Sequence, residues 1–534
     1  DTWPAVLAAS PLVRVVTAHD AVPVYDERPL VAWGSRVYTQ RQWIDEGIVA
    51  ASILQRASAP MIAASPRALA TLDALLPPLD DGVPNRQHAA VLAALRSHLT
   101  VICGGPGTGK THTVARLLAV LGVDAAHRGG SLRIGLAAPT GKAAARLRDA
   151  LATAARSMPT GNPDAATIAL AELPAVTIQR LLGPRPDSST RFVHHAGRRL
   201  GHDVVVIDEA SMVSLPLMAR LLEAVRDDAR LILVGDPDQL ASIEVGSVLA
   251  DIVRRAADPG SPLAANIVRL DRPRRQASGS PIAVLAEAVR TNQPQRALAL
   301  LRGSASANAG GETFELRFVE HDQPPAALTA VRNELDPTLA IALDSARDGD
   351  ASAALAALAQ VRVLCAHRRG PFGVQQWNHS IESWMLGTRP LHRQYAGRAV
   401  LITRNDPRTG LANGDTGVVV QDGSALRVAF AIGAETRLFT PAQLDAEDTA
   451  FALTIHRSQG SEYDTVVVIL PPASSALAGR ELLYTAVTRA TRRLVVVGSA
   501  AAVEACITHP GQRISGLYAA LGGPPDDNRT DSER

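Results

Sequence analysis

Short runs of consecutive apolar residues alternate with longer amphipathic stretches over residues 86–256. Four runs rich in aliphatic residues lie there: LTVIC (99–103), IGLAAP (134–139), VVVIDE (204–209) and LILVGD (231–236). Helix-length segments separate them, and this alternation predicts βαβ units in a mainly parallel sheet covered on both faces. We therefore expect a first α/β domain over residues 85–259, with a small loop-like insertion at about 184–201.

A second set of buried-strand runs follows nearer the C-terminus. It comprises VRVLCA (361–366), FALTIH (451–456), DTVVVIL (464–470) and RLVVVGS (493–499), and it predicts another α/β domain over residues 260–521. NGD and DGS turns between short alternating segments interrupt this domain at about 397–447, which predicts a small inserted antiparallel barrel. Stretches rich in Gly and Ser at 260–263 and 303–311 are expected to be flexible joints.

The two ends of the chain have patterns of their own. Residues 1–84 combine short apolar runs, three tryptophans and a turn-rich end, and we expect a small, mostly helical module there that contacts a partner. The polar tail 522–534 is expected to be disordered. Because the sequence starts with Asp1 rather than Met, we expect it to begin inside a longer product.

Composition excludes more than it identifies. A net charge of +2 does not by itself indicate a nucleic-acid partner. Three widely separated cysteines without CxxC spacing suggest neither a disulfide framework nor a zinc site. No run approaches the roughly 20 apolar residues of a membrane span, and the start lacks a signal-peptide pattern. We therefore expect a soluble cytoplasmic protein.

Lysine is nearly absent, which draws attention to the two positions that keep it. Lys and Arg together number 54, and only Lys110 and Lys142 are lysine. Because a slim ammonium fits inside a tight backbone loop where a planar guanidinium does not, both positions are candidates for phosphate or DNA contact. The alternative is a coding bias that left two lysines by chance.

The first lysine lies in a phosphate-loop motif. GGPGTGKT (104–111) fits the G-x-x-x-x-G-K-[ST] template directly after a predicted strand and before a predicted helix. Its glycines let successive N–H groups point at phosphate oxygens, and the helix N-terminus adds its positive dipole end. The residues predicted to bind the nucleotide are Gly104, Gly105, Pro106, Gly107, Thr108, Gly109, Lys110 and Thr111. Lys110 would reach the β- and γ-phosphates of ATP, and the Thr111 hydroxyl would bind Mg²⁺.

Two further strand ends carry polar side chains that suit ATP hydrolysis. VVVIDE ends in adjacent acids at the strand edge where open α/β sheets bind ligands. Asp208 would hold Mg²⁺, and Glu209 would orient and deprotonate the attacking water. Gln239, after LILVGD, could bond the γ-phosphate or that water without adding charge. Each pattern alone also fits a surface turn. For Asp236 we expect either a structural cap or a supporting role behind the residues that contact the nucleotide.

Six motifs in fixed order carry a family resemblance. They are GGPGTGKT (104–111), APTGKAAARL (138–147), VVVIDEASM (204–212), LILVGDPDQL (231–240), TIHRSQGSEYD (454–464) and LLYTAVTRA (482–490). This set resembles the RecD family of superfamily 1 DNA helicases over about residues 85–500. The resemblance implies two RecA-like P-loop motor domains with ATP between them, and an SH3-like barrel inserted in the second.

The resemblance also implies roles that spacing alone does not. Arg275 and Arg489 would be arginine fingers that stabilise the transition state. Gln87 would read adenine, and Gly460 would link the DNA strand to ATP. The DNA contacts implied are Thr140, Gly141, Lys142, Thr454, His456 and Ser458. Two positions depart from the family pattern, since Gln179 replaces a usual His and Arg274 a usual aromatic.

Three functions follow, in order of preference. The first is an ATP- and Mg²⁺-dependent 5′-to-3′ DNA helicase, the alpha subunit of a RecBCD-type helicase–nuclease that processes double-strand breaks for recombinational repair. Its implied partners are DNA and RecB-like and RecC-like subunits in a heterotrimer, with the nuclease on a partner. The second is a stand-alone RecD-like helicase. The third is a catalytically silent DNA-binding scaffold subunit, against which the intact ATPase residues argue.

Overall fold

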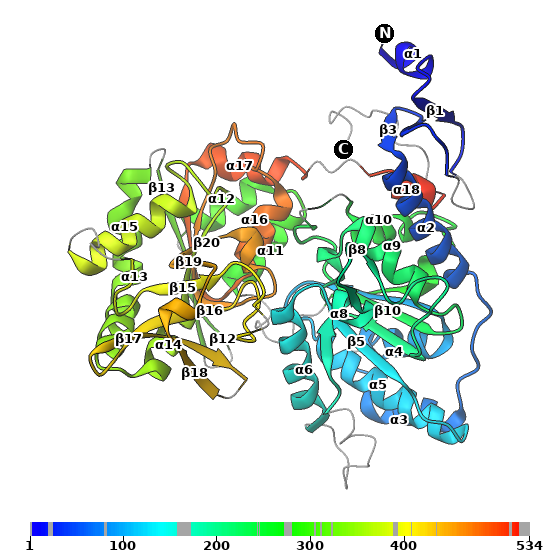
Figure 1. Cartoon of the computed structure of the whole chain (residues 1–534), viewed down its shortest axis with the longest axis horizontal. Helices are drawn as coiled ribbons and strands as arrows, with labels where there is room; N and C mark the ends of the chain where they lie inside the picture. The colour runs from blue at the N-terminus through cyan, green and yellow to red at the C-terminus, as the bar shows by residue number, and fades with distance from the viewer. Residues whose placement is uncertain are drawn as a thin grey trace. The chain divides into compact units, whose positions relative to one another are not determined.

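The chain divides into two compact units, each described here by itself. The computed structural model describes residues 3–19, 25–79, 83–156, 172–242, 244, 246–271, 280–303, 306–309, 312–321, 324–387, 393–406, 408–433, 435–511 and 515–522. The first unit comprises Asp1–Pro237, Ala241–Arg274 and Arg513–Arg534, and the second comprises Asp238–Leu240 and Arg275–Gln512 (Figure 1).

A six-stranded parallel sheet forms the centre of the first unit. Its order is β11-β4-β10-β9-β5-β6, with all neighbours parallel. The strands are β4 (Leu99–Gly104), β5 (Ile134–Ala138), β6 (Ala175–Thr177), β9 (Val204–Ile207), β10 (Arg230–Gly235) and β11 (Ile267–Leu270). Strands β4 and β9 are buried along their whole length, as expected of parallel strands covered on both faces. The four strands predicted for the first domain are thereby confirmed.

Alternate side chains of these strands enter two separate cores. Leu99, Val101 and Val205 join one core, and Ile102 and Val206 join the other. The first core includes residues of α2 (Gln40–Ala57), α9 (Leu215–Ala224) and α10 (Val248–Ala256). The second includes residues of α3 (Pro66–Leu75), α4 (Arg86–Arg96), α5 (Lys110–His127) and α6 (Gly141–Arg156). The period-two alternation of a strand therefore builds both helical layers.

The N-terminal region combines three helices with a small sheet that the sequence pattern did not predict. After α1 (Trp3–Ala8), strands β1 (Val13–Val16), β2 (Leu30–Trp33) and β3 (Arg36–Thr39) form a three-stranded sheet. Each strand has only four residues, too few for alternation to show in the sequence. Helices α2 and α3 pack in the cores of the first unit, so residues 1–84 are not separate from it.

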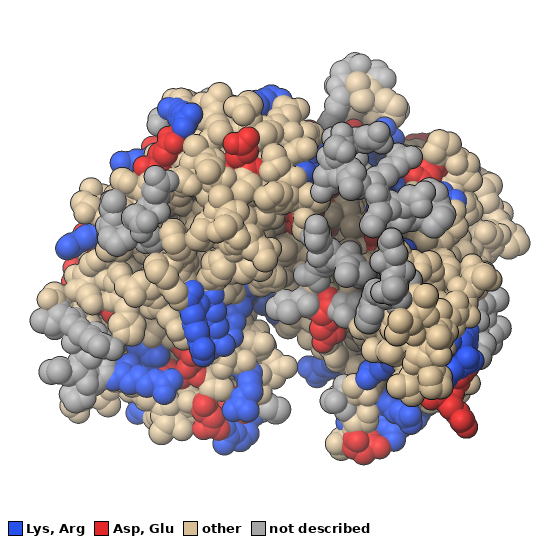
Figure 2. Space-filling view, turned by 90° about the horizontal axis from the view of Figure 1, so that it is seen from above, with Lys and Arg blue, Asp and Glu red and all other residues tan. Residues whose placement is uncertain are grey.

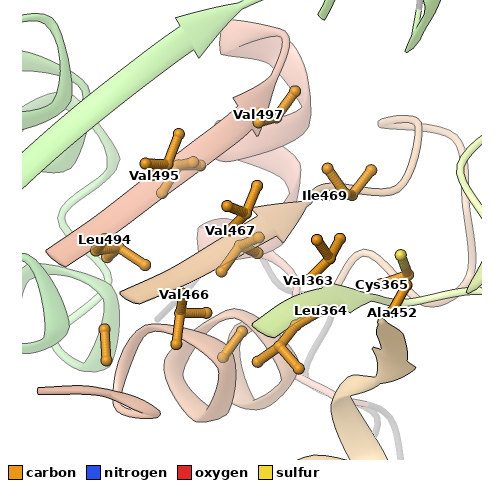
Figure 3. Close-up of a cluster of buried hydrophobic side chains, with 14 of the residues drawn as sticks. Val363, Leu364, Cys365, Ala452, Val466, Val467, Ile469, Leu494, Val495 and Val497 are labelled. Carbon is orange, nitrogen blue, oxygen red and sulfur yellow. The ribbon is translucent and has the colours of Figure 1, made fainter. Parts of the chain in front are cut away.

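A second six-stranded sheet forms the centre of the second unit, in the order β12-β13-β22-β21-β14-β20. Its strands are β12 (Ser306–Ala309), β13 (Glu312–Glu320), β14 (Val361–Cys365), β20 (Ala452–Thr454), β21 (Tyr463–Ile469) and β22 (Ala490–Gly498). Only β12 is antiparallel to its neighbour. Figure 3 shows aliphatic side chains of four of these strands meeting in the core, among them Val363, Val467 and Val495. The four predicted strands of the second domain are confirmed.

Helices surround this sheet, and a second, antiparallel sheet is inserted in the unit. The helices are α11 (Pro281–Arg290), α12 (Pro294–Arg302), α13 (Pro324–Arg347), α14 (Ala351–Gln360), α15 (Val374–Leu386), α16 (Arg480–Val487) and α17 (Ala500–Thr508). The inserted strands are β15 (Ala399–Ile402), β16 (Thr416–Asp422), β17 (Ala425–Ile432), β18 (Glu435–Phe439) and β19 (Glu447–Thr449). The short 3₁₀ helix η3 (Pro441–Gln443) lies between β18 and β19. They pair in the order β18-β17-β16-β15-β19 around a core of their own. Within the described residues the two outer strands do not pair, so the antiparallel insertion is present as an open sheet.

Three predicted boundaries were wrong. Strand β11 belongs to the first sheet, so the first domain extends beyond residue 259 to Arg274. The predicted joint at 303–311 contains edge strand β12. Residues 513–521 belong to the first unit, where α18 (Leu517–Ala520) contacts α10 and α2, rather than to the second domain. All three elements have only four residues, which is too short for a clear hydrophobic pattern to show in the sequence.

The remaining predictions concern the insertion at 184–201, the tail, membrane helices and the surface charge. The insertion at 184–201 contains a hairpin of β7 (Pro184–Arg185) and β8 (Ser188–Phe192), and α8 (Ile178–Leu182) precedes it. Residues 523–534 of the tail lie outside the described residues. Where the chain is described, no helix is long and apolar enough to cross a membrane. On the face in Figure 2, Lys and Arg gather in separate patches interspersed with acidic and neutral surface, consistent with the small net charge.

Candidate nucleotide and DNA sites

The phosphate loop lies between β4 and α5 and turns on glycines. Gly107 and Gly109 have φ of 74° and 84°, a left-handed conformation that glycine adopts without strain. A Cβ on Gly104 would lie 2.5 Å from the Leu270 carbonyl oxygen, so this position has room only for glycine. The loop therefore leads into the N-terminus of α5, where free N–H groups and the helix dipole favour an anion.

Lys110 is held against the loop that it follows. Its ammonium donates to the carbonyl oxygens of Gly104 at 2.7 Å and Gly105 at 3.0 Å. The Thr108 hydroxyl also donates to the Gly105 carbonyl, at 2.8 Å. These contacts place the ammonium at the start of α5, beside Thr111, where the loop would present its N–H groups to phosphate oxygens.

The two acids follow β9 at the carboxyl edge of the same sheet. The Asp208 N–H donates to the Ala137 carbonyl at 2.9 Å and extends the pairing of β9 with β5. Burial and the neighbouring Glu209 carboxylate raise the pKa of Asp208 to about 7, while Lys110 and Arg146 favour its charged form. The structure thus brings Lys110 and Asp208 together, as the sequence predicted.

Glu209 has an unusual backbone conformation. Its φ of 50° is left-handed, and it precedes the short helix η1 (Ala210–Met212). Non-glycine residues in this region cost of the order of 1 kcal/mol and are frequent at functional sites. The strain is consistent with a carboxylate whose direction is fixed for a task.

The donor set includes two oxygen ligands of the kind that Mg²⁺ accepts. Within the described residues, no group of three or more His, Cys, Asp or Glu side chains could hold a metal ion. Mg²⁺ needs only one or two protein oxygens when phosphate oxygens supply others. Thr111 and Asp208 offer a hydroxyl and a carboxylate at the phosphate loop, which meets that requirement.

Gln87 lies at the start of α4 and contacts the phosphate loop directly. Its amide nitrogen donates to the carbonyls of Thr108 at 3.4 Å and Gly109 at 3.5 Å. The side chain is buried, and its amide oxygen has no hydrogen-bond partner among the described residues. An acceptor is therefore present for an N–H₂ group such as that of adenine.

In the second unit, the structure joins two predicted catalytic residues. Arg489 is buried and donates to the Gln239 amide oxygen at 3.1 Å. Other donors of its guanidinium reach the carbonyls of Thr485 at 3.2 Å and Ser461 at 3.1 Å and the Thr488 hydroxyl at 3.5 Å. Arg489 and Gln239 therefore form one hydrogen-bonded cluster, although 250 positions separate them in the sequence.

The neighbours of Gln239 are anchored in the same way. The Leu240 N–H donates to the Thr485 hydroxyl at 2.8 Å, and the Gln459 amide donates to the Leu240 carbonyl. Gly460 follows Gln459 with a φ of 68°. The segment Asp238–Leu240, which follows β10 after two residues, is thus tied to the loop that carries the fifth motif and to the helix that carries the sixth.

The DNA candidates of the first unit gather at the start of α6. Gly141 and Lys142 are in its first turn, and the Thr140 hydroxyl accepts from the Ala143 N–H at 3.2 Å. Arg146 follows Lys142 by one helical turn and therefore shares its face. Since Arg146 lies near enough to Asp208 to affect its pKa, this helix connects the candidate DNA contacts with the acids.

The candidates of the second unit lie at η4 (Ile455–Ser458), and one of them does not fit its predicted role. The Thr454 hydroxyl accepts from the Arg457 N–H at 3.4 Å and caps this helix, which includes His456. Ser458 is fully buried and donates to the Ile455 carbonyl at 2.8 Å. Its hydroxyl is therefore not at a surface that DNA could reach, because it closes the turn of η4. Arg275 lies outside the described residues.

Sequence reasoning missed two parts of this site. Arg146 was overlooked, although its spacing of four from Lys142 was a usable signal. The anchoring of Asp238–Leu240 by Gln459 and Thr485 left no signal, since it joins segments that are far apart in the sequence.

Together the two units have the parts of a P-loop motor ATPase, and comparisons with known proteins agree. The family described as AAA domain matches residues 87–245, and the UvrD-like helicase C-terminal domain matches residues 449–497. A "RecBCD enzyme subunit RecD" from Mycolicibacterium smegmatis is 44% identical over 525 residues, which cover 98% of this chain and 86% of that protein. The chain belongs to the RecD family of ATP-dependent DNA helicases.

Two further relatives are more distant. An "ATP-dependent RecD2 DNA helicase" from Deinococcus radiodurans is 32% identical over 428 residues, which cover 78% of this chain and 49% of that protein. Among solved structures, a Pif1 helicase from a study of unwinding at forked duplex DNA is 15% identical, with a TM-score of 0.40 and coverage of 82% of this chain and 94% of that one.

Proposed function

We propose that this chain is the alpha subunit of a RecBCD-type helicase–nuclease in the bacterial cytoplasm, and that it moves 5′ to 3′ along single-stranded DNA. The observation that supports coupling of ATP hydrolysis to movement on DNA is the anchoring of Asp238–Leu240 by Gln459, Thr485 and Arg489. This segment follows ATPase strand β10, and Gln459 follows the candidate DNA contacts of η4. Binding or hydrolysis of ATP would therefore affect the candidate DNA contacts of η4 through a few hydrogen bonds.

Within the proposal, each nucleotide-site residue has one task. The phosphate loop and Lys110 hold the phosphates, while Thr111 and Asp208 hold Mg²⁺, which neutralises charge that develops on the phosphates. Glu209 takes the proton of the attacking water. Arg489 and Arg275 stabilise the transition state, and Gln239 positions Arg489.

The partners follow from the relatives. The Mycolicibacterium smegmatis protein is named as a subunit of the RecBCD enzyme, and the match covers 86% of its length. We therefore propose RecB-like and RecC-like partners, with the inserted antiparallel sheet as the SH3-like element of the family. The stand-alone alternative rests on the Deinococcus radiodurans helicase, about half of whose length lies outside the match.

The ATPase part of the proposal is tested by Lys110→Gln. Lys110 would donate to phosphate oxygens whose negative charge grows in the transition state. Loss of one such donor lowers the rate about 10²–10³-fold, so DNA-stimulated ATP hydrolysis should fall by that factor. Arg332→Ala, which removes an exposed surface charge in the second unit, is the matched control and should hydrolyse ATP at the wild-type rate. Stimulated hydrolysis retained by Lys110→Gln would contradict the assignment of the loop.

Polarity and partners need a separate assay. The chain, alone and with co-purified partners, should unwind duplexes with a 5′ single-stranded tail and leave those with a 3′ tail intact. Preference for the 3′ tail would refute the proposed direction. Full unwinding by the isolated chain, with no partner recovered in co-purification, would favour the stand-alone helicase.

A further inference from the structure

Two arginines and one aspartate converge at the carboxyl edge of the second sheet. Strands β14 and β20 are parallel neighbours, and Cys365 at the end of β14 pairs in register with Thr454 at the end of β20. Arg368 follows the first strand by three residues, and Arg457 follows the second by three. Because the carboxyl ends of parallel strands are where open α/β sheets bind ligands, this edge is a favourable place for a binding site.

A third element supplies the aspartate. Asp448 lies on β19, the last strand of the inserted sheet, and pairs in register with Leu401 of β15. Its Oδ2 lies 3.7 Å from Arg368 Nη2 and 3.5 Å from Arg457 Nη1. One carboxylate oxygen is therefore shared by guanidinium groups from two different loops.

The contacts to Asp448 are looser than a bidentate ion pair. Arg302 binds Glu320 through two hydrogen bonds of 3.0 and 2.7 Å, which use the guanidinium fork. Neither Arg368 nor Arg457 makes a side-chain hydrogen bond to any other described residue, and both contacts to Asp448 exceed hydrogen-bond length for charged groups. Their donors therefore remain free for another acceptor.

The charge balance favours an anion as that acceptor. Two positive groups share one negative group, and their side chains are 63% and 36% exposed, against 44% for Asp448. A guanidinium fork matches the oxygens of a phosphodiester, and two forks facing one point can grip one phosphate. Thr454, the candidate DNA contact at the end of β20, caps the helix that carries Arg457.

We propose that Arg368 and Arg457 bind a phosphate of single-stranded DNA, and that Asp448 is a positioning residue that holds the two guanidinium groups at one point. The inference rests on the proposed function as a DNA motor. It extends that function to three residues that the family resemblance gave no role. Binding would be independent of base sequence, because it uses backbone phosphate alone.

Affinity for a fluorescein-labelled oligothymidylate, measured by anisotropy at several salt concentrations with the full chain, tests the phosphate contact. Arg368→Ala and Arg457→Ala should each weaken binding about tenfold, as expected for a charged hydrogen bond. Because both guanidinium groups bind one phosphate, the double variant Arg368→Ala/Arg457→Ala should lower the slope of log affinity against log salt by about 0.7, the value for one phosphate contact on single strands, and each single variant should lower it by less. Arg332→Ala is the control, since Arg332 is 49% exposed in a helical ion pair with Asp336 and should change neither quantity.

Asp448→Asn separates positioning from simple charge. Removing a negative charge should by itself strengthen DNA binding, as Asp336→Asn is expected to do slightly, because Asp336 is similarly exposed at 45%. If Asp448 positions the arginines, Asp448→Asn instead weakens binding about threefold, of the order of one exposed ion pair. Tighter binding by Asp448→Asn would overturn the positioning role.

The remaining outcomes are distinct. Arg368→Lys and Arg457→Lys keep the charge but lose the fork, so they should bind with intermediate affinity and nearly the wild-type salt slope. Wild-type affinity and slope in both alanine variants would overturn the phosphate site while leaving the helicase intact. If oligothymidylate does not stimulate ATP hydrolysis by the wild-type chain, the proposed function itself is wrong.

Discussion

Substitution of Gln87 can test whether this residue recognises adenine or only supports the phosphate loop. Its amide nitrogen lies 3.4 and 3.5 Å from two loop carbonyls, at the weak end of hydrogen-bond geometry, so each contact contributes at most about 0.5 kcal/mol. Its buried amide oxygen has no partner among the described residues, and an unmade bond of this kind costs about 1–3 kcal/mol. Gln87→Met keeps the side-chain volume and removes both the weak hydrogen bonds to the loop and the unpaired amide oxygen.

The expected changes in stability and selectivity therefore diverge. Gln87→Met should unfold within about 1 kcal/mol of the wild type, a Tm shift of about 2–4 °C for a domain of this size. One hydrogen bond from the adenine N–H₂ group to the Gln87 amide oxygen is worth about 0.5–1.5 kcal/mol, so the preference for ATP over GTP should fall by about 2- to 13-fold.

The assay is kcat/KM for ATP and for GTP in the presence of saturating single-stranded DNA, measured for the wild type, Gln87→Met and Gln87→Ala. The alanine variant adds a cavity and should lose more stability than the methionine variant while losing the same selectivity. An unchanged ATP-to-GTP ratio in Gln87→Met would refute adenine reading and leave Gln87 as a support for the loop.

Two further predictions concern the candidate DNA and catalytic residues. Lys142→Ala should weaken oligothymidylate binding and lower the salt slope by about 0.7, whereas Lys142→Arg should keep the slope; an unchanged slope in the alanine variant would exclude a phosphate contact. Arg489→Lys loses donors to Gln239, Thr485 and Ser461, so thermal melting should show a loss of about 3 kcal/mol and kcat should fall about 10³-fold. A normal kcat would show that Arg489 only supports the fold.

The nucleotide site was predictable because it is local in the sequence. GGPGTGKT combines a strand, a turn that requires glycine and a helix N-terminus within a dozen residues, so its chemistry can be inferred before its position in space is known. Asp208 followed from the same logic, since four buried aliphatic residues identify the strand that it ends.

Short strands were not predictable. Strands β1, β2, β3 and β11 have four residues each, so their pattern of apolar and polar residues resembles that of a loop. Ser458 shows the same limit at a single residue, because its motif position suggested DNA while its complete burial gives its hydroxyl to Ile455.

The sequence by itself determined two mainly parallel α/β sheets, an antiparallel insertion and the phosphate-loop motif that identifies candidate nucleotide-binding residues. Only the tertiary structure decided which distant residues act together, since Arg489 meets Gln239, and Asp448 meets both Arg368 and Arg457. The physical reason is that hydrophobic periodicity and turn chemistry act over a few residues. Hydrogen bonds between loops depend instead on how the strands are ordered and registered in each sheet.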